Sequence, residues 1–212
     1  MKKQVHSIVR LYPGKERYLI TIRVRLDNTY IMKQEALEVL YNRRAIRSFK
    51  PEQIKDEELD AVLKAGEYAP TAMGLQSPLI VSVQNKEDID KLNELSAKIM
   101  GTNPRPGTLP YYGAPTIIIV FATERARNEL LGILDASAVC TNILNAAYAV
   151  GLGSCWINRA KEIFELEEGK ALLKKWGIDE PVTGVASIAL GYSNQEHPIP
   201  KPRRDGYVVK IK

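Results

Sequence analysis

The sequence predicts an α+β fold built around one main domain. Residues 117–121 form a continuous β-branched and aromatic run, which is typical of a strand buried on both faces. Residues 125–150 follow it as a predicted long helix, and the stretch 136–150 is apolar almost all round, which predicts partners on every side. The chain has no internal repeat and no low-complexity linker, so we expect a single α+β domain.

The composition supports this class and excludes several others. The 212 residues are 45% hydrophobic and 26% charged, which is ordinary for a globular protein and excludes disorder, collagen and coiled coil. Residues 114–122 are the longest apolar run and fall below the roughly 18 residues that a membrane helix needs. Neither a secretory signal nor a cysteine framework stands out. We therefore expect a cytoplasmic protein with no membrane span and no metal.

The formal net charge of +5 comes from the beginning of the chain. Residues 1–31 hold seven basic and two acidic side chains, so residues 32–212 are neutral overall. A nucleic-acid-binding module would need a basic face interleaved with aromatic residues, and the neutral body argues against one. Two β-prone runs around Pro13-Gly14 indicate either a hairpin or an extension of marginal structure. We expect a basic extension at 1–31 and the functional domain at 32–212.

The other elements follow from local patterns. An apolar stripe at 36–40 predicts a helix that begins near Met32 and ends at 42–44. Asp56 is a suitable N-cap for a second helix, which we expect to end before Pro70. The remaining expected elements are a strand at 80–83, a helix at 88–100, a loop at 101–113, an extended piece at 153–157, a helix at 163–176 broken near Gly169, and a strand at 182–190.

Two basic segments are candidate phosphate clamps. Arg43, Arg44 and Arg47 lie at the end of the first helix, where cations suit the helix dipole. Three guanidinium groups exceed that need, and their planar forks match a phosphate. Lys201 and Arg203 lie in a tail that three prolines stiffen, so this stretch is either a docked strand or a solvated tail.

Two further segments combine small residues with extended backbone. The loop at 69–78 would let a flat ligand approach its backbone, or is an ordinary helix–strand connection. The piece at 153–158 follows a glycine C-cap and would expose N–H groups. Cys155 has no histidine near it in the sequence, so we expect a buried structural thiol. Phosphate clamps without an evident acid, base or nucleophile predict a bound cofactor that carries the chemistry.

In this order and spacing, the four segments resemble the nitroreductase family of FMN-dependent oxidoreductases. Residues 43–47 match its Arg-Arg-Ser-x-Arg-like motif, and 69–78 match its Ala-Pro-Ser-x-x-Asn-x-Gln-Pro-Trp loop. Residues 151–157 read Gly-Leu-Gly-Ser-Cys-Trp-Ile, close to a family signature, and the basic stretch at 201–203 matches as well. The resemblance implies a three-layer α/β/α sandwich with a mostly antiparallel sheet, in an interlocked homodimer with two FMN at the interface.

The resemblance also implies which residues bind the cofactor. The arginine motif and the C-terminal stretch would clamp the phosphate and ribityl chain, and the 69–78 loop would line the isoalloxazine from the other subunit. Backbone N–H groups near residue 158 would reach flavin N5, and no side chain would act as acid or base. The implied cofactor-binding residues are Arg43, Arg44, Ala45, Arg47, Pro70, Thr71, Ala72, Met73, Gly74, Gln76, Gly153, Ser154, Ile157, Asn158, Lys201 and Arg203.

The implied activity is reduction of nitroaromatics, quinones or similar small acceptors by NAD(P)H, in a ping-pong hydride transfer through flavin N5. The alternatives are a flavin-binding protein without turnover and a specialised member such as a reductive dehalogenase. Ala45 stands where the family usually has Ser, and Gly74 where Asn is common, so we expect an altered pocket. Tyr111 and Tyr112 either cover the substrate or pack where the strand at 117–121 begins.

Overall fold

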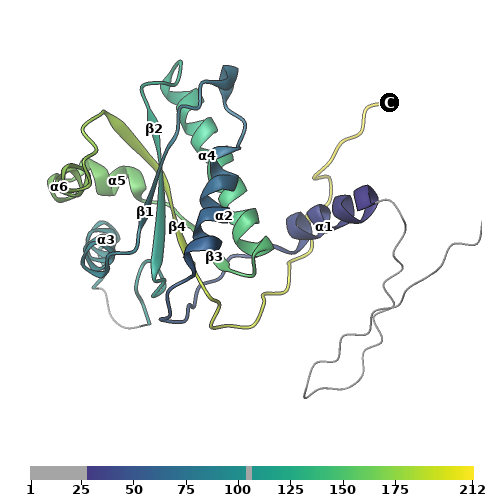
Figure 1. Cartoon of the computed structure of the whole chain (residues 1–212), viewed down its shortest axis with the longest axis horizontal. Coiled ribbons are helices and arrows are strands. Elements are labelled where there is room, and N and C mark those ends of the chain that lie inside the picture. Colours follow the sequence, from purple (N-terminus) through teal and green to yellow (C-terminus); the bar gives the residue numbers. More distant parts are fainter. Residues whose placement is uncertain (1–27, 104–106) are drawn as a thin grey trace, which may run out of the picture. The chain divides into compact units, whose positions relative to one another are not determined.

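The computed structural model describes residues 28–103 and 107–212 (Figure 1). The chain divides into two units, residues 1–41 and 42–212. The hairpin expected at the start of the chain lies outside the described residues. Helix α1 (Asn28–Asn42) begins four residues before the expected Met32. That expectation rested on the apolar stripe at 36–40, which does not mark where the helix begins.

The second unit is built on a four-stranded antiparallel sheet. Its strands are β1 (Leu79–Val83), β2 (Thr116–Thr123), β3 (Gly153–Ile157) and β4 (Val182–Gly191), in the spatial order β1-β2-β4-β3. Every neighbouring pair is antiparallel. All eight residues of β2 are buried, as their continuous apolar character predicts.

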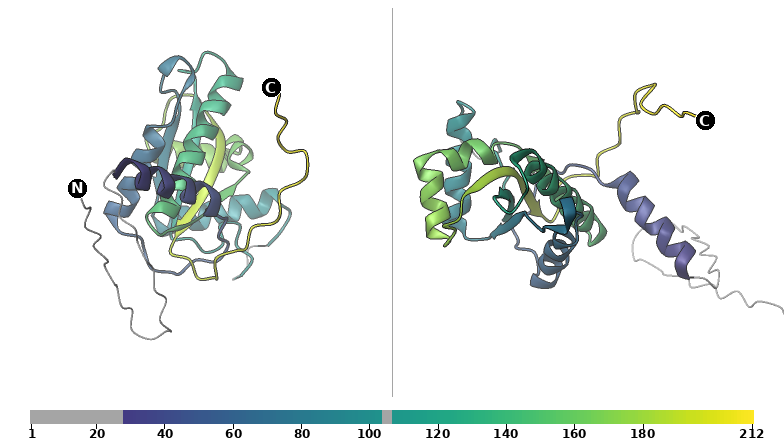
Figure 2. Two further views of the ribbon diagram at one scale, coloured as in Figure 1. Left: turned by 90° about the vertical axis from the view of Figure 1, so that its right-hand side faces the viewer. Right: turned by 90° about the horizontal axis from the view of Figure 1, so that it is seen from above.

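Helices cover both faces of this sheet and complete the three layers (Figures 1 and 2). Alternate side chains of β2 explain the arrangement, because successive strand residues point to opposite faces. Ile117, Ile119 and Phe121 pack into one apolar core, and Ile118 and Val120 pack into the other. The first core is closed by α3 (Lys86–Ile99), α5 (Ala160–Glu165) and α6 (Glu167–Lys175), and the second by α2 (Asp56–Glu67) and α4 (Glu129–Ala149). The predicted α+β sandwich with an antiparallel sheet is confirmed.

Helix α4 is the one described helix that is long and apolar enough to cross a membrane by length and composition alone. It buries a face that includes Val139 and Ile143 against the sheet and α2, as a core helix does. It begins at Glu129, later than expected, because Asn128 caps it by accepting the Leu131 N–H. Within the described part of the chain its outer side is left open, with Leu130 65% exposed, so a partner on that side would be another chain.

The expected helix at 163–176 is two helices, and the break lies at Leu166 rather than near Gly169. Leu166 has extended backbone angles and ends α5 as it begins α6. Gly169 lies inside α6 at a close approach to α5, where an added Cβ would lie 1.9 Å from the Ile163 carbonyl oxygen. The glycine therefore marks a packing requirement between the two helices and not the end of one.

Candidate functional site

The arginine motif continues the sheet beyond β3. Ala45 forms a parallel bridge with Ser154, and the Ile46 N–H donates to the Ser154 carbonyl oxygen over 3.0 Å. The buried side chain of Ile46 anchors this segment in the apolar core. On the other side, the Arg47 N–H donates to Gln195 Oε1 over 2.8 Å. The residues that flank the arginines are thus held by backbone pairing at the edge of β3.

The three guanidinium groups of this motif carry unneutralised charge. Within the described part of the chain, none of them forms an ion pair. Arg44 donates through Nη1 to the Arg43 carbonyl oxygen, but its buried Nε has no hydrogen-bond partner. Burial lowers the pKa of Arg43, and repulsion from Arg44 lowers it further. An orphaned buried donor and repelling cations favour an anionic ligand at this place.

Strand β3 supplies the other predicted residues of this region. Gly153 and Ser154 are buried, Ile157 is half-buried, and Asn158 is exposed just beyond the strand. Asn158 Oδ1 accepts a hydrogen bond from Trp156 Nε1 over 2.8 Å. Together with the arginine motif these residues form what we call the arginine–β3 cluster, which consists of Arg43, Arg44, Ala45, Arg47, Gly153, Ser154, Ile157 and Asn158.

Cys155 is buried inside the same strand. Burial raises the pKa of its thiol, although Arg47 and Arg43 partly oppose the rise. A thiol with a raised pKa is a poor nucleophile at neutral pH. The structure therefore supports the structural role expected from the sequence.

The 69–78 loop leaves α2 and enters β1 through a single 3₁₀ turn, Ala72–Gly74. Thr71 Oγ1 accepts the Gln76 N–H over 3.0 Å, which closes the loop on itself. Met73, Gly74 and Gln76 have left-handed backbone angles. Pro70, Met73, Gly74 and Gln76 are exposed, whereas Thr71 and Ala72 are half-buried.

Two polar residues that the sequence reasoning missed hold this loop. Asp135 of α4 accepts hydrogen bonds from the Ala72 N–H and the Ser77 hydroxyl, each over 2.8 Å. Thr123, at the end of β2, donates through Oγ1 to the Ser77 carbonyl oxygen over 2.7 Å. The available signal for Asp135 was a carboxylate within an otherwise apolar helical segment. Nothing in the sequence distinguished Thr123.

A single chain does not bring the 69–78 loop to the arginine–β3 cluster. Ser154 pairs with Leu190, which pairs with Thr116 at one end of β2, whereas the loop is bonded to Thr123 at the other end. With a rise of about 3.4 Å per residue, these two ends are roughly 24 Å apart, and Ile157, which is aligned with Ile119 through Ser187, lies roughly 14 Å along the sheet from the loop end. The predicted cofactor residues therefore form two separate groups.

The basic tail lies apart from both groups. Lys201 and Arg203 are exposed, in a described segment after Ser193 that has no helix or strand. The beginning of the tail is fixed, because the Asn194 N–H donates to the Ser48 carbonyl oxygen over 2.9 Å and the His197 ring contacts the Asn42 carbonyl oxygen over 2.8 Å. The tail thus starts beside the arginine motif, but its two basic residues are not brought into it.

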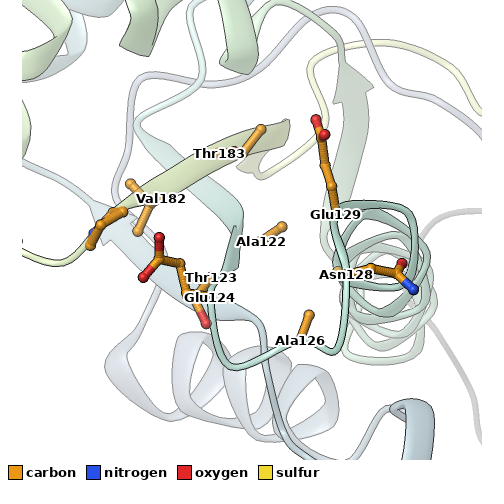
Figure 3. Close-up of a pocket in the computed structure, with 10 residues that line it drawn as sticks. Ala122, Thr123, Glu124, Ala126, Asn128, Glu129, Val182 and Thr183 are labelled. Atoms are coloured by element: carbon orange, nitrogen blue, oxygen red, sulfur yellow. The ribbon is translucent and has the colours of Figure 1, made fainter.

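A cavity of about 400 Å³ with a mixed polar and apolar lining opens at the Thr123 end of the sheet, between the end of β2, the beginning of α4 and β4 (Figure 3). It contains none of the predicted cofactor residues. The residues that line it are Ala122, Thr123, Glu124, Ala126, Asn128, Glu129, Gly132, Pro181, Val182 and Thr183.

Tyr111 and Tyr112 behave differently from each other. Tyr111 is fully buried, and its hydroxyl bonds to Ser187 Oγ over 3.2 Å. Burial raises its pKa to about 12. Tyr112 is partly exposed and has a left-handed backbone. Of the two expectations for these tyrosines, cover of the substrate or packing, Tyr111 therefore follows the second and packs in the core where β2 begins.

Comparison with known proteins gives a consistent result. The model of the Nitroreductase family matches residues 40–192. A relative from Archaeoglobus fulgidus, which has a provisional NADH dehydrogenase/NAD(P)H nitroreductase name, is 31% identical over 77% of this chain and 88% of its own length.

Solved structures agree with this match. A nitroreductase with bound FMN from Bacteroides fragilis superposes with a TM-score of 0.75 at 27% identity, over 84% of this chain and 99% of that one. A second nitroreductase with bound FMN, from Desulfitobacterium hafniense, has a TM-score of 0.74 at 25% identity, over 84% of this chain and 98% of that one. Together with the family match and the confirmed fold, these likenesses show that the chain belongs to the nitroreductase family.

Proposed function

We propose that this nitroreductase-family oxidoreductase binds FMN and uses NAD(P)H to reduce small oxidised acceptors such as nitroaromatics and quinones. The observation that carries the proposal is the unneutralised arginine motif at the edge of β3. The two solved relatives hold FMN, and the Archaeoglobus relative is named for NAD(P)H and nitroreduction. We place the functional domain at residues 32–212.

The residues present fit a phosphate-bearing cofactor. Arg44 Nε is buried without a partner, and Arg43 is partly desolvated beside a second cation, so a phosphate dianion would satisfy the donor and relieve the repulsion. Arg47 is exposed at the same edge. Lys201 and Arg203 would complete the clamp by folding the tail back from its fixed start beside residue 48. Ala45 adds no hydroxyl to this site.

A bound FMN would supply the two-electron redox chemistry between NAD(P)H and the acceptor. The protein orients the reactants and excludes water. The arginine segment already covers Gly153 and Ser154, with Ile46 against Gly153, so Ile157 and Asn158 are the part of β3 and its end that is left accessible to a flat ring. The backbone N–H of Asn158 is the proposed donor toward the ring. No side chain is required as an acid or base.

We propose a homodimer in which the loop of one protomer completes the site of the other. Within one chain, Ser154 lies roughly 24 Å and Ile157 roughly 14 Å along the sheet from the end that holds the loop, which supports this arrangement, since one ring beside β3 does not span either distance. Leu130 and Leu134, 65% and 53% exposed on α4, supply apolar surface for such an interface. Each dimer would then bind two FMN.

Titration of the cofactor-free protein with FMN, followed by light scattering, tests the proposal. We expect one FMN per protomer, with quenched or shifted flavin emission, and a mass of two chains. A protein that leaves the flavin spectrum unchanged at saturating FMN would contradict the proposal. A protein that binds FMN but is not reduced by either nicotinamide nucleotide would favour flavin binding without turnover.

A further inference from the structure

The buried carboxylate of Asp135 joins both ends of the strained turn in the 69–78 loop. Asp135 is 6% exposed and lies in the N-terminal half of α4. Its Oδ1 accepts from the Ala72 N–H, before the turn, and its Oδ2 accepts from the Ser77 hydroxyl, after it. We propose that Asp135 is a positioning residue that fixes the shape of this loop for contact with the flavin. This inference rests on the proposed function, which places the loop against the flavin ring.

The loop needs such a restraint because its backbone is unfavourable. Met73 and Gln76 have φ angles of 56° and 50°, in the left-handed region that residues with a side chain rarely adopt. Conformations of this kind persist only where the surroundings enforce them. Burial does not enforce this one, because Met73 is 71% exposed. Hydrogen bonds to the loop must therefore supply the restraint.

The loop is held by hydrogen bonds within it and by contacts to the rest of the chain. Within the loop, Thr71 Oγ1 accepts the Gln76 N–H, and the Gly74 and Leu75 N–H groups donate to the Thr71 and Ala72 carbonyl oxygens. Outside it, Arg127 Nη1 donates weakly to Met73 Sδ over 3.6 Å. The side-chain contacts from outside that join oxygen or nitrogen atoms are the two to Asp135 and the one from Thr123 to the Ser77 carbonyl oxygen. Two of these three, including the one at Ala72, therefore depend on a single side chain.

A carboxylate is the group that this position requires. Burial of a charged group is unfavourable unless hydrogen bonds compensate for it. In the described residues Asp135 forms no ion pair, so its compensation comes from the two loop donors. An amide in the same place has one neutral accepting oxygen, so it could keep the Ala72 N–H only without charge assistance and would have to donate to the Ser77 hydroxyl instead of accepting from it. Packing alone would have been satisfied by an apolar residue.

The position of Asp135 connects the loop to the proposed dimer surface. Leu134 is its neighbour in α4, and Leu130 lies one turn earlier on the exposed side of the same helix. The exposed side of α4 therefore forms the proposed dimer surface, and Asp135 on its buried side holds the 69–78 loop. We infer that the loop is shaped before FMN binds, so that less ordering is required when the site is completed.

Asp135→Asn is the decisive variant because it keeps the side-chain volume and removes one accepting oxygen. We expect the Kd for FMN to rise about tenfold, because both loop contacts lose their charged acceptor and the Ser77 contact has to reverse its direction. We also expect the visible circular dichroism of the bound flavin to change, because that signal reports the surroundings of the ring. Ser77→Ala removes one donor of the pair and should shift both readouts in the same direction, by less.

Ser137→Ala is the matched control, because Ser137 lies in the same helix and donates to the Ile133 carbonyl oxygen instead of the loop. It should leave the Kd and the flavin signal unchanged. If Asp135→Asn does not fold, Ser77→Ala decides the question with the same two readouts.

The outcomes separate the two hypotheses. If the wild type does not bind FMN, the proposed function fails and the inference fails with it. If the wild type binds FMN, and folded Asp135→Asn and Ser77→Ala match it in both Kd and flavin circular dichroism, the proposed function stands and the positioning role of Asp135 is overturned.

Discussion

The Ile46 N–H donates to the Ser154 carbonyl oxygen over 3.0 Å, so a segment that follows the first helix is bonded to the edge of β3 more than one hundred residues later. This contact places the three arginines beside the small residues Gly153 and Ser154 at the beginning of β3. Because the flanking backbone is fixed and the guanidinium charges are not neutralised, the arrangement is prepared for an anion.

Arg43→Gln should weaken FMN binding without lowering the stability of the cofactor-free protein. The change removes a cation that is partly desolvated and repelled by Arg44, so the melting temperature of the cofactor-free protein should not fall. The Kd for FMN should rise, by roughly tenfold or more, because a charge-assisted contact to phosphate is lost. Fluorescence titration measures the Kd, and Arg125→Gln, an exposed arginine in the β2–α4 turn, is the control. An unchanged Kd would remove Arg43 from the clamp.

Asp88→Asn should weaken the contact between α3 and α6. Asp88 is buried and accepts from Lys175 Nζ over 2.6 Å and from Trp176 Nε1 over 3.0 Å. Burial opposes its ionisation, but these hydrogen bonds outweigh burial and leave the pKa of Asp88 below its ordinary value. The variant should lose about 1–3 kcal/mol of unfolding free energy. Asp90→Asn is the control, because its pair with Lys86 is exposed and should contribute less than about 0.5 kcal/mol.

The same carboxylate predicts a pH dependence with a definite sign. Its folded-state pKa is below the unfolded value of about 3.9, so its stabilisation is complete above that pH and is lost as the pH falls through the folded-state pKa. Denaturant unfolding of the wild type at a series of pH values below 5 should show this loss. Asp88→Asn should show a flatter profile there, and parallel profiles would contradict the assignment.

Gly169→Ala tests the packing of α5 on α6. An added Cβ would lie 1.9 Å from the Ile163 carbonyl oxygen, which forces the two helices apart. We expect a loss of about 2 kcal/mol or more, measured by thermal unfolding. Lys170→Ala, at an exposed position of the same helix, should change the stability far less. A Gly169→Ala protein as stable as the wild type would show that the helices tolerate separation.

Cys155→Ala should retain catalysis. The thiol is buried and its pKa is raised by burial, so it does not act as a nucleophile near neutral pH. We expect NAD(P)H-dependent turnover within about twofold of the wild type, with a modest loss of stability from the missing sulfur atom. A loss of turnover in a folded variant that still binds FMN would assign Cys155 a chemical role.

Much of the fold was predictable because its signals are local. The apolar run of β2 and the amphipathic pattern of α3 result from burial on two faces and on one face, respectively. The break at Leu166 was not predictable, because a Leu has no intrinsic tendency to end a helix. The break was predicted near Gly169 because glycine is a poor helix former. Glycine is required there because a Cβ would collide with the Ile163 carbonyl oxygen in the folded chain.

The candidate site was predictable only as segments. Local sequence identified the arginine motif and the 69–78 loop, but their separation along β2 depends on the strand order β1-β2-β4-β3, which no local pattern encodes. Asp135 was missed for a related reason. Its partners Ala72 and Ser77 lie far from it in the chain, so its function becomes apparent only in the folded structure.

The most direct test of the central claim is the visible absorbance of the FMN-loaded protein during anaerobic addition of NADH or NADPH. The account predicts that at least one nucleotide bleaches the oxidised flavin, and that a nitroaromatic or a quinone added afterwards restores its absorbance. Flavin that stays oxidised with both nucleotides, in a protein that has bound FMN stoichiometrically, would contradict the claim that this chain is an NAD(P)H-dependent flavin oxidoreductase.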